Sequence, residues 1–516
     1  MPPGRVYSQP MTFPTLLRRA IVSLTCGLIV LTAAHAAPTT DLPDIGTPAD
    51  AVFTTQDEYQ IGTMIVRELR DSGVILDDPE IGEYIQGLGA RLAAHAQEGN
   101  TKFTFLVLKD SSINAFALPG GFVVVHSGLV LATTGESELA GVIAHEISHV
   151  TQRHIARSIQ NSGRSSLVST AAMLAAILVG AISGNSNVGM AGVIGAQNAA
   201  IQHQLNFSRE NEFEADRVGI GVMAAAGYDP NAMGTFFGTL GRRMGSAGIN
   251  AKILEFLQTH PVTSARVAEA RSRALTYPVV RPVDTVGYQL TREKLRVLAL
   301  PIDSDPHDAY ADAASRETVV SEYRLYGRAL ALVQGKSPAE AVPVLQDLVA
   351  RHPDTVEYHS ALGQALLAAG DIPGSRAELA HSMQLFPRSI PITVRYAETL
   401  MRADNARLAH TVLLDLFNAV PPTHDQVRLI ALAASAAGEA AEANYYMAEY
   451  DVMSGDLPLA IQTLRQALAV PTITPVQRSR YKARIDELKE YLPLRQQAAV
   501  DRGEPLPPQT PDDNRR

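Results

Sequence analysis

Two histidines four residues apart, His145 and His149, enclose Glu146 in the pentapeptide HEISH, which fits the pattern His-Glu-x-x-His. On a helix this spacing places both imidazoles about 6 Å apart along the axis and about 40° apart around it, so they face one point. Such a pair suits a tetrahedral zinc ion, and the neighbouring carboxylate could take a proton from a zinc-bound water. The alternative is two histidines on an ordinary amphipathic helix, and five letters alone do not decide.

A catalytic zinc ion needs a third protein ligand and an open fourth position. The segment SRENEFEAD, residues 208–216, places Glu212 and Asp216 four residues apart on one helical face. Glu212 is a candidate for the third ligand, and Asp216 for the acceptor of a ligand imidazole N–H. Glu210 and Glu214 point away from this face and are expected in solvent. The alternative for the whole segment is a charged surface helix.

The apolar pattern predicts the elements that hold these residues. Strands are expected over 102–109 and 121–126, which are rich in β-branched and aromatic residues, with the segment NAFALPGG joining them. Helices are expected at the following places: two over 55–97, one from about Glu136 to about Gln160, one over roughly 208–225, and a pair ending near 275. Together they predict an α+β domain over residues 50–280.

An apolar run of small residues, LVSTAAMLAAILVGAI at 167–182, follows the HEISH helix. It is shorter than the roughly 20 residues that a membrane-spanning helix needs. We expect residues 167–200 to form a helical hairpin packed on the core. Peripheral membrane contact, or a lid over the site, is the alternative.

The C-terminal half repeats with a period of 34 residues, the spacing between Pro353, Pro387 and Pro421. This is the period of tetratricopeptide helix pairs, and the turns QGKSPAEA, AAGDIPGS and MSGDLPLA share the expected Gly or Asp break. Taking Pro387 as a closing proline makes Gly363 the small residue of a first helix and Leu379 the large residue of its partner.

The boundaries follow from composition. The pattern predicts an all-α repeat solenoid over 320–495, with three to five helix pairs by about residue 470. It also predicts a Pro-rich linker over 281–319 and a disordered tail over 496–516.

The N-terminus reads as a secretory signal over residues 1–36. Arg18-Arg19 precede an apolar run, and Ala34-His35-Ala36 is an A-x-A cleavage site. The only cysteine, Cys26, lies inside this signal, so the mature chain would have none. Export without disulfides fits a bacterial periplasm. The net charge of −9 and the lack of a basic cluster argue against nucleic-acid binding.

Four motifs in order carry a family resemblance: NAFALPGG, VIAHEISHVTQRH, SRENEFEADRVG and THPVTSARV. They resemble the zinc metallopeptidase family that includes HtpX and the CAAX prenyl endopeptidases. The secreted branch with C-terminal tetratricopeptide repeats, the β-barrel assembly-enhancing proteases, is most similar. The resemblance implies a zincin-like (gluzincin) fold with one zinc ion bound by His145, His149 and Glu212. It also implies that Glu146 is the general base.

The first and last motifs supply further candidates. NAFALPGGFVVVH resembles an edge strand that pairs with an extended substrate, with Asn114 holding a substrate backbone group and Gly120 and Gly121 allowing close approach; a plain hairpin turn is the alternative. Arg266 could stabilise the oxyanion. His260 could help there, or could bind zinc as a fourth ligand that keeps the enzyme latent.

Three other histidines, His126, His154 and His203, are expected to have structural roles. As a whole, the sequence predicts a periplasmic zinc endopeptidase acting on unfolded or misassembled outer-membrane proteins. Its repeats would bind an outer-membrane assembly machine. The second hypothesis is a repeat-mediated chaperone or scaffold with little proteolysis.

Overall fold

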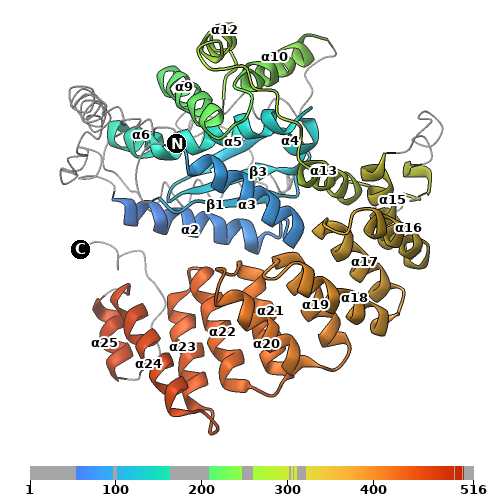
Figure 1. The fold of residues 1–516 in the computed structure, drawn as a ribbon. Helices are drawn as coiled ribbons and strands as arrows, with labels where there is room; N and C mark the ends of the chain where they lie inside the picture. The colour runs from blue at the N-terminus through green and yellow to red at the C-terminus, as the bar shows by residue number, and fades with distance from the viewer. Residues whose placement is uncertain are drawn as a thin grey trace, which may run out of the picture. The chain divides into compact units, whose positions relative to one another are not determined.

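The computed structural model describes residues 54–96, 101–162, 208–246, 260–301, 304–305, 307–310, 321–492, 494–502 and 504. The expected signal segment and the apolar segment 167–200 lie outside these residues. Figure 1 shows a small sheet among helices in the first half of the chain and helices throughout the second. Within the described ranges, no helix is long and apolar enough to cross a membrane.

The sheet has three strands, β1 (Thr104–Leu108), β2 (Ala115–Leu118) and β3 (Phe122–His126), in the order β1-β3-β2. β3 runs parallel to β1 and antiparallel to β2, with Phe116 opposite Val124. Its five residues are all buried, because it is the central strand and is covered on both faces. The apolar pattern predicted β1 and β3 and made residues 115–118 part of a connection, whereas the family resemblance indicated an edge strand in this segment. Residues 115–118 form β2, at one edge of the sheet.

The helices of the first half lie around this sheet. They are α2 (Thr55–Asp71), α3 (Pro79–Ala93), α4 (Ser127–Ala132), α5 (Glu136–Thr151), α6 (His154–Ser162), α9 (Arg209–Ala225), α10 (Asn231–Ser246) and α12 (Ser264–Ala274). Helix α5 packs against β2, β3 and α3, and α9 packs along α5 (Figure 1). The single helix expected to reach Gln160 is instead divided, because Arg153 adopts the left-handed conformation at φ 52° and ends the first helix.

The segment 281–319, expected to be a linker, contains a further helix, α13 (Val286–Leu298). This helix carries two pairs of apolar residues, and the two members of each pair are seven residues apart. Tyr288 and Leu295 belong to the core under the sheet, whereas Leu290 and Val297 belong to the core of the first repeat helices. The Pro-rich composition before the helix concealed this amphipathic pattern, and only part of the segment is a connection.

The second half consists of helix pairs, as the 34-residue period predicts. The helices are α15 (Glu322–Gln334), α16 (Pro338–Arg351), α17 (Val356–Ala368), α18 (Ile372–Leu385), α19 (Ile390–Arg402), α20 (Ala406–Phe417), α21 (His424–Ala436), α22 (Ala440–Met453), α23 (Leu457–Ala469), α24 (Pro475–Glu490) and α25 (Leu494–Arg502). Gly363 lies against Leu379, whose side chain is 2.6 Å from the place of a Cβ at residue 363. The predicted small and large residues therefore meet.

The predicted disordered tail begins too early. Residues 496–502 belong to α25, where Gln496 and Ala499 are buried and Val500 packs on the last repeat core. Two apolar residues in a polar segment gave too weak a periodic signal to predict this helix. Residues 505–516 lie outside the described part of the chain.

Candidate metal centre

Helix α9 approaches the backbone of α5 closely because Gly219 has no side chain. A Cβ at this position would lie 3.1 Å from the backbone nitrogen of His145 and 3.2 Å from the carbonyl carbon of Ala144. The N-terminus of α9 is fixed by Ser208, whose hydroxyl accepts the backbone N–H of Asn211 at 3.2 Å. This packing brings the first turns of α9, with Glu212, over the histidines of α5.

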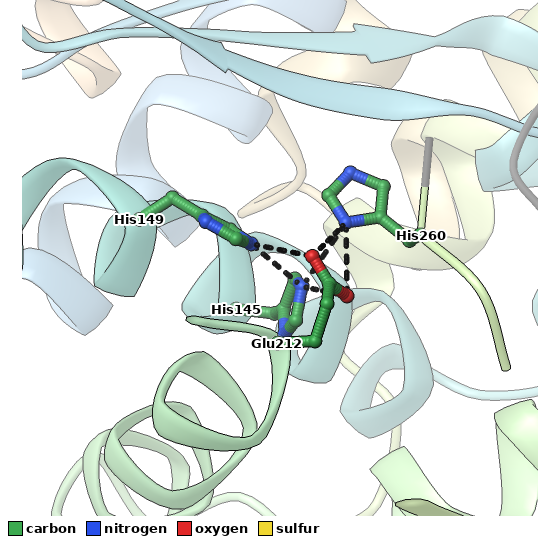
Figure 2. A group of neighbouring side chains, drawn as sticks. All are labelled: His145, His149, Glu212 and His260. Atoms are coloured by element: carbon green, nitrogen blue, oxygen red, sulfur yellow. Dashed lines mark hydrogen bonds and ion pairs between the residues drawn. The ribbon is translucent and has the colours of Figure 1, made fainter. Parts of the chain in front are cut away.

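Four buried side chains converge on one point: His145 and His149 from α5, Glu212 from α9, and His260 just before α12 (Figure 2). One ligand atom from each lies within 4.8 Å of all the others. The two Nε2 atoms of His145 and His149 are 3.0 Å apart. They lie 3.6 and 3.4 Å, respectively, from the nearer carboxylate oxygen of Glu212.

His260 completes the group through its Nδ1 atom. This atom lies 3.3 Å from Nε2 of His145 and 3.2 Å from Oε1 of Glu212. Ligands that bind one zinc ion tetrahedrally with bonds of about 2.0–2.1 Å are about 3.3 Å from one another. The donor types and their separations of 3.0–3.6 Å therefore fit a single zinc ion.

Asp216 and Arg266 hold this group from behind. Asp216 places Oδ1 3.0 Å from Nδ1 of His145, on the side of the ring away from Glu212. Arg266 from α12 forms a bidentate pair with Asp216 at 2.7 and 2.8 Å and also lies 2.6 Å from Glu212. Asp216 therefore lies beside the ring of His145, and its role as acceptor of that ring's N–H stays a prediction.

The observed contacts of Arg266 differ from its expected role. Its guanidinium is buried and binds Asp216, Glu212 and the carbonyl oxygen of Pro261 at 3.0 Å. These contacts position the ligands. Stabilisation of an oxyanion by Arg266 stays a prediction.

The electrostatic surroundings favour the protonation states that a metal ion needs at two ligands. Burial lowers the pKa of His149 well below its usual value, so this imidazole is neutral. Burial opposes ionisation of Glu212, but the charge of His260 and hydrogen bonds from the histidines outweigh it and hold the pKa of Glu212 well below its usual range. At His145, burial is outweighed by Asp216 and Glu212, which raise its pKa to about 10. A metal cation would displace that proton.

Glu146 lies at the edge of the group. Its carboxylate is fully buried, and Oε1 is 3.5 Å from Nε2 of His260. Burial raises the pKa of Glu146, against the opposing charges of His260 and His145. A carboxylate with a raised pKa holds an abstracted proton better than an exposed one.

The edge strand β2 packs directly on α5. Asn114, immediately before it, is buried, and its carbonyl oxygen accepts the backbone N–H of His126 at 3.0 Å. Gly120 and Gly121 turn the chain into β3 with φ of 80° and 86°. A Cβ at Gly121 would lie 2.3 Å from the carbonyl oxygen of Lys102. The turn therefore requires both glycines, and a role of these residues in substrate binding stays a prediction.

His154, for which a structural role was expected, contacts the metal group, and Glu214 contacts His154 in turn. Nδ1 of His154 is 2.8 Å from Nδ1 of His149, and Nε2 of His154 is 3.2 Å from Glu214. Glu214 was expected in solvent, but its side chain points from α9 towards α6, where it contacts His154. The motif HEISHVTQRH contained the signal, a third histidine after the pair. His126 packs in the sheet with Ser112 at 2.7 Å, and His203 lies outside the described residues.

Comparisons with known proteins identify the family. The model of peptidase family M48 matches residues 80–274, which include all four members of the metal group. The β-barrel assembly-enhancing protease of Escherichia coli K12 is 32% identical over 482 residues, which is 92% of this chain and 96% of that protein. The chain belongs to peptidase family M48. Within M48 it falls in the branch of β-barrel assembly-enhancing proteases, and it is a zinc metalloprotease.

Two further relatives match different shares of the chain. A β-barrel assembly-enhancing protease of Vibrio cholerae is 34% identical over 478 residues, covering 92% of this chain and 97% of that protein. The mitochondrial metalloendopeptidase OMA1 of Schizosaccharomyces pombe is 33% identical over 184 residues, covering 36% of this chain and 50% of that protein. Likeness to the bacterial M48 proteases extends through the repeats.

Proposed function

We propose that the chain is a zinc-dependent endopeptidase of the bacterial periplasm that degrades misfolded or misassembled outer-membrane proteins and aids their assembly. The names of the relatives that match over most of the chain support this substrate class. The A-x-A site after an apolar run and the absence of cysteine beyond Cys26 support export to the periplasm. The repeats are then the surface for an outer-membrane assembly machine.

The observation that carries the peptidase mechanism is the buried group around Glu212. We assign Nε2 of His145, Nε2 of His149 and the carboxylate of Glu212 as the ligands of one zinc ion. A bound zinc ion supplies a water of lowered pKa and polarises the peptide carbonyl. Oδ1 of Asp216 lies 3.0 Å from Nδ1 of His145, and this charged contact holds the ring with Nε2 turned to the metal.

Glu146 acts as the general base. Its place next to His145 on α5 puts the carboxylate beside the metal group without making it a ligand. It takes the proton from the attacking water and delivers it to the leaving amide nitrogen. The substrate lies extended along β2, where edge-strand backbone groups pair with the substrate backbone and present its carbonyl to the site.

His260 keeps this site closed. Its Nδ1 atom has the separations of a fourth ligand, 3.3 Å from His145 and 3.2 Å from Glu212. A catalytic zinc ion keeps one position open for water and substrate. Movement of His260 away from the group is therefore the step that activates the enzyme.

The decisive experiment compares wild type with Glu146→Gln and the control Glu210→Gln, using casein and an unfolded outer-membrane barrel protein. Glu210 is an exposed residue two positions from Glu212. Removing the base should lower kcat/KM at least about 100-fold with zinc content unchanged, and the control should cut like wild type. Cutting by Glu146→Gln at the wild-type rate would contradict the mechanism.

The same variants test the second candidate, a repeat-mediated chaperone or scaffold of envelope assembly. The helix pairs from α15 to α24 favour it as an additional role, because such arrays bind protein partners. The measurement is the integrity of the cell envelope, taken as the sensitivity of cells carrying each variant to detergents and large antibiotics. If Glu146→Gln abolishes cutting but preserves envelope integrity, binding is the main function. If Glu146→Gln abolishes both cutting and envelope integrity, proteolysis is the main function.

A further inference from the structure

The two histidines of the HEISH motif are supported differently on the side away from the metal. Both turn Nε2 towards Glu212 and carry Nδ1 on the opposite side of the ring. Nδ1 of His145 lies 3.0 Å from a carboxylate oxygen of Asp216. Nδ1 of His149 lies 2.8 Å from Nδ1 of His154. One ligand is therefore supported by a carboxylate and the other by an imidazole.

A break in the helix makes this second contact possible. Residues five apart on one continuous helix point about 140° apart, so His154 could not reach His149 if α5 continued. Instead α5 ends at Thr151, Arg153 takes φ 52°, and α6 begins at His154. The side chain of Arg153 lies 3.2 Å from Glu58 of α2, an ion pair that holds the turn in place.

The contact directs the hydrogens along a chain of three groups. When Nε2 of His149 binds a metal ion, its ring is neutral and carries its hydrogen on Nδ1. That hydrogen is donated to Nδ1 of His154, which must then carry its own hydrogen on Nε2. Nε2 of His154 lies 3.2 Å from Oε2 of Glu214, the acceptor at the end. Arg157 holds the same oxygen at 3.0 Å.

We propose that His154 is a positioning residue of the metal site, which fixes the ring and the hydrogen position of His149 and is itself oriented by Glu214. It touches neither substrate nor the reacting atoms, and acts through His149 alone. His154 is fully buried and its ring meets that of His149 at 76° with centroids 4.9 Å apart, so it has one defined orientation. Groups that orient a metal-binding histidine typically change metal affinity about 10–100-fold when removed.

The proposal rests on the proposed zinc site, and zinc affinity tests it separately from catalysis. Zinc alone is the probe, titrated against a chromophoric chelator on the full-length chain. His154→Phe should lower zinc affinity about 10–100-fold. His154→Gln, whose amide can accept from His149 and donate to Glu214, should recover most of it. Glu214→Gln should cause a smaller loss than His154→Phe.

His359→Phe is the matched control. His359 is also buried and also contacts a carboxylate, Glu378 at 2.7 Å, but it lies on repeat helix α17. Its substitution should leave zinc affinity unchanged. Equal affinity of His154→Phe and wild type would overturn the proposal while leaving the zinc site intact. No zinc binding by wild type would overturn the proposed function itself.

A measurement on wild type covers the case in which His154→Phe does not fold. Nitrogen-15 NMR of histidine-labelled, zinc-loaded protein reports which ring nitrogen carries the hydrogen. The expected result is Nδ1–H for His149 and Nε2–H for His154. A hydrogen on Nδ1 of His154 would contradict the proposal, because that nitrogen could not then accept from His149.

Discussion

Nζ of Lys294 on α13 lies 2.7 Å from Oε2 of Glu80 on α3, and both side chains are buried. Arg395 of α19 lies 3.3 Å from the same oxygen, and Ser360 of α17 donates a hydrogen bond to the other. Although burial opposes ionisation, Lys294 and Arg395 hold the pKa of Glu80 well below its usual range. This carboxylate therefore links a helix beside the sheet to α13 and to two repeat helices.

Removing the lysine from this cluster should destabilise the protein. Lys294→Met leaves the buried Glu80 and the half-buried Asp78 with one cation fewer, and breaking a buried ion pair in this way costs about 3–5 kcal/mol. The control is Lys489→Met, which removes a surface pair with Asp501 and should cost less than about 1 kcal/mol. Urea unfolding is followed by circular dichroism, because the chain has no tryptophan. Equal midpoints for the two variants would show that the cluster contributes little.

Substituting His260 should increase basal proteolysis. His260→Ala removes the fourth ligand atom next to His145 and Glu212 and opens that position to water. The initial rate of casein cleavage should rise, while zinc remains bound through three ligands with lower affinity. A rate equal to that of wild type would end the latency hypothesis. Glu146→Gln in the same background should abolish the added activity.

Two helical glycines, one packed closely between α9 and α5 and one in open space, should respond oppositely to substitution by alanine. Gly219→Ala places a methyl group 3.1 Å from the backbone of His145, so it should lower the free energy of unfolding by about 1–3 kcal/mol and weaken zinc binding. Gly241→Ala, in a helix with open space around it, should stabilise by about 0.5–1 kcal/mol. Tighter zinc binding by Gly219→Ala would show that the helices have room to close further.

One buried histidine of the repeats should make stability depend on pH. Burial and the charges of Arg70 and Arg428 lower the pKa of His424 to about 4, although Asp425 lies 3.7 Å away. An unfolded histidine takes up a proton near pH 6.5, so the stability due to the neutral ring is full above that pH and is lost as the pH falls towards 4.

At pH 5 this loss amounts to about 2 kcal/mol. His424→Gln should remove it, so the variant should lose about 2 kcal/mol less than wild type between pH 7.5 and pH 5. His381→Gln is the control, because His381 is exposed on α18. The prediction fails if the His424 variant and wild type lose stability equally, as measured by urea midpoints at both pH values.

Much of the metal group could be predicted because helical spacing is local. Four-residue spacing placed His145 beside His149 and Glu212 beside Asp216, and the structure has both pairs on single helix faces. The contact of His154 could not be predicted in this way. It depends on the backbone of Arg153, a residue whose left-handed conformation has no sequence signal.

The fold was predicted best where periodic patterns are long. The 34-residue period gave the repeat helices, including the contact of Gly363 with Leu379. The apolar pattern did not show strand β2, because four residues, Ala115–Leu118, are too few for an alternating pattern. Only the family resemblance indicated an edge strand there. Helix α13 was not predicted, because its apolar residues are divided between two hydrophobic cores. The residues that face either core alone do not form a complete apolar stripe along the helix.

Helix α13 also decides where the peptidase can be separated from the repeats. A cut at residue 281, where the composition changes, would remove Tyr288 and Leu295 from the core under the sheet. A cut after α13 would keep that core whole but expose Leu290 and Val297 to water. An isolated peptidase therefore has to retain the chain through Leu298 and needs polar replacements at those two positions to stay soluble.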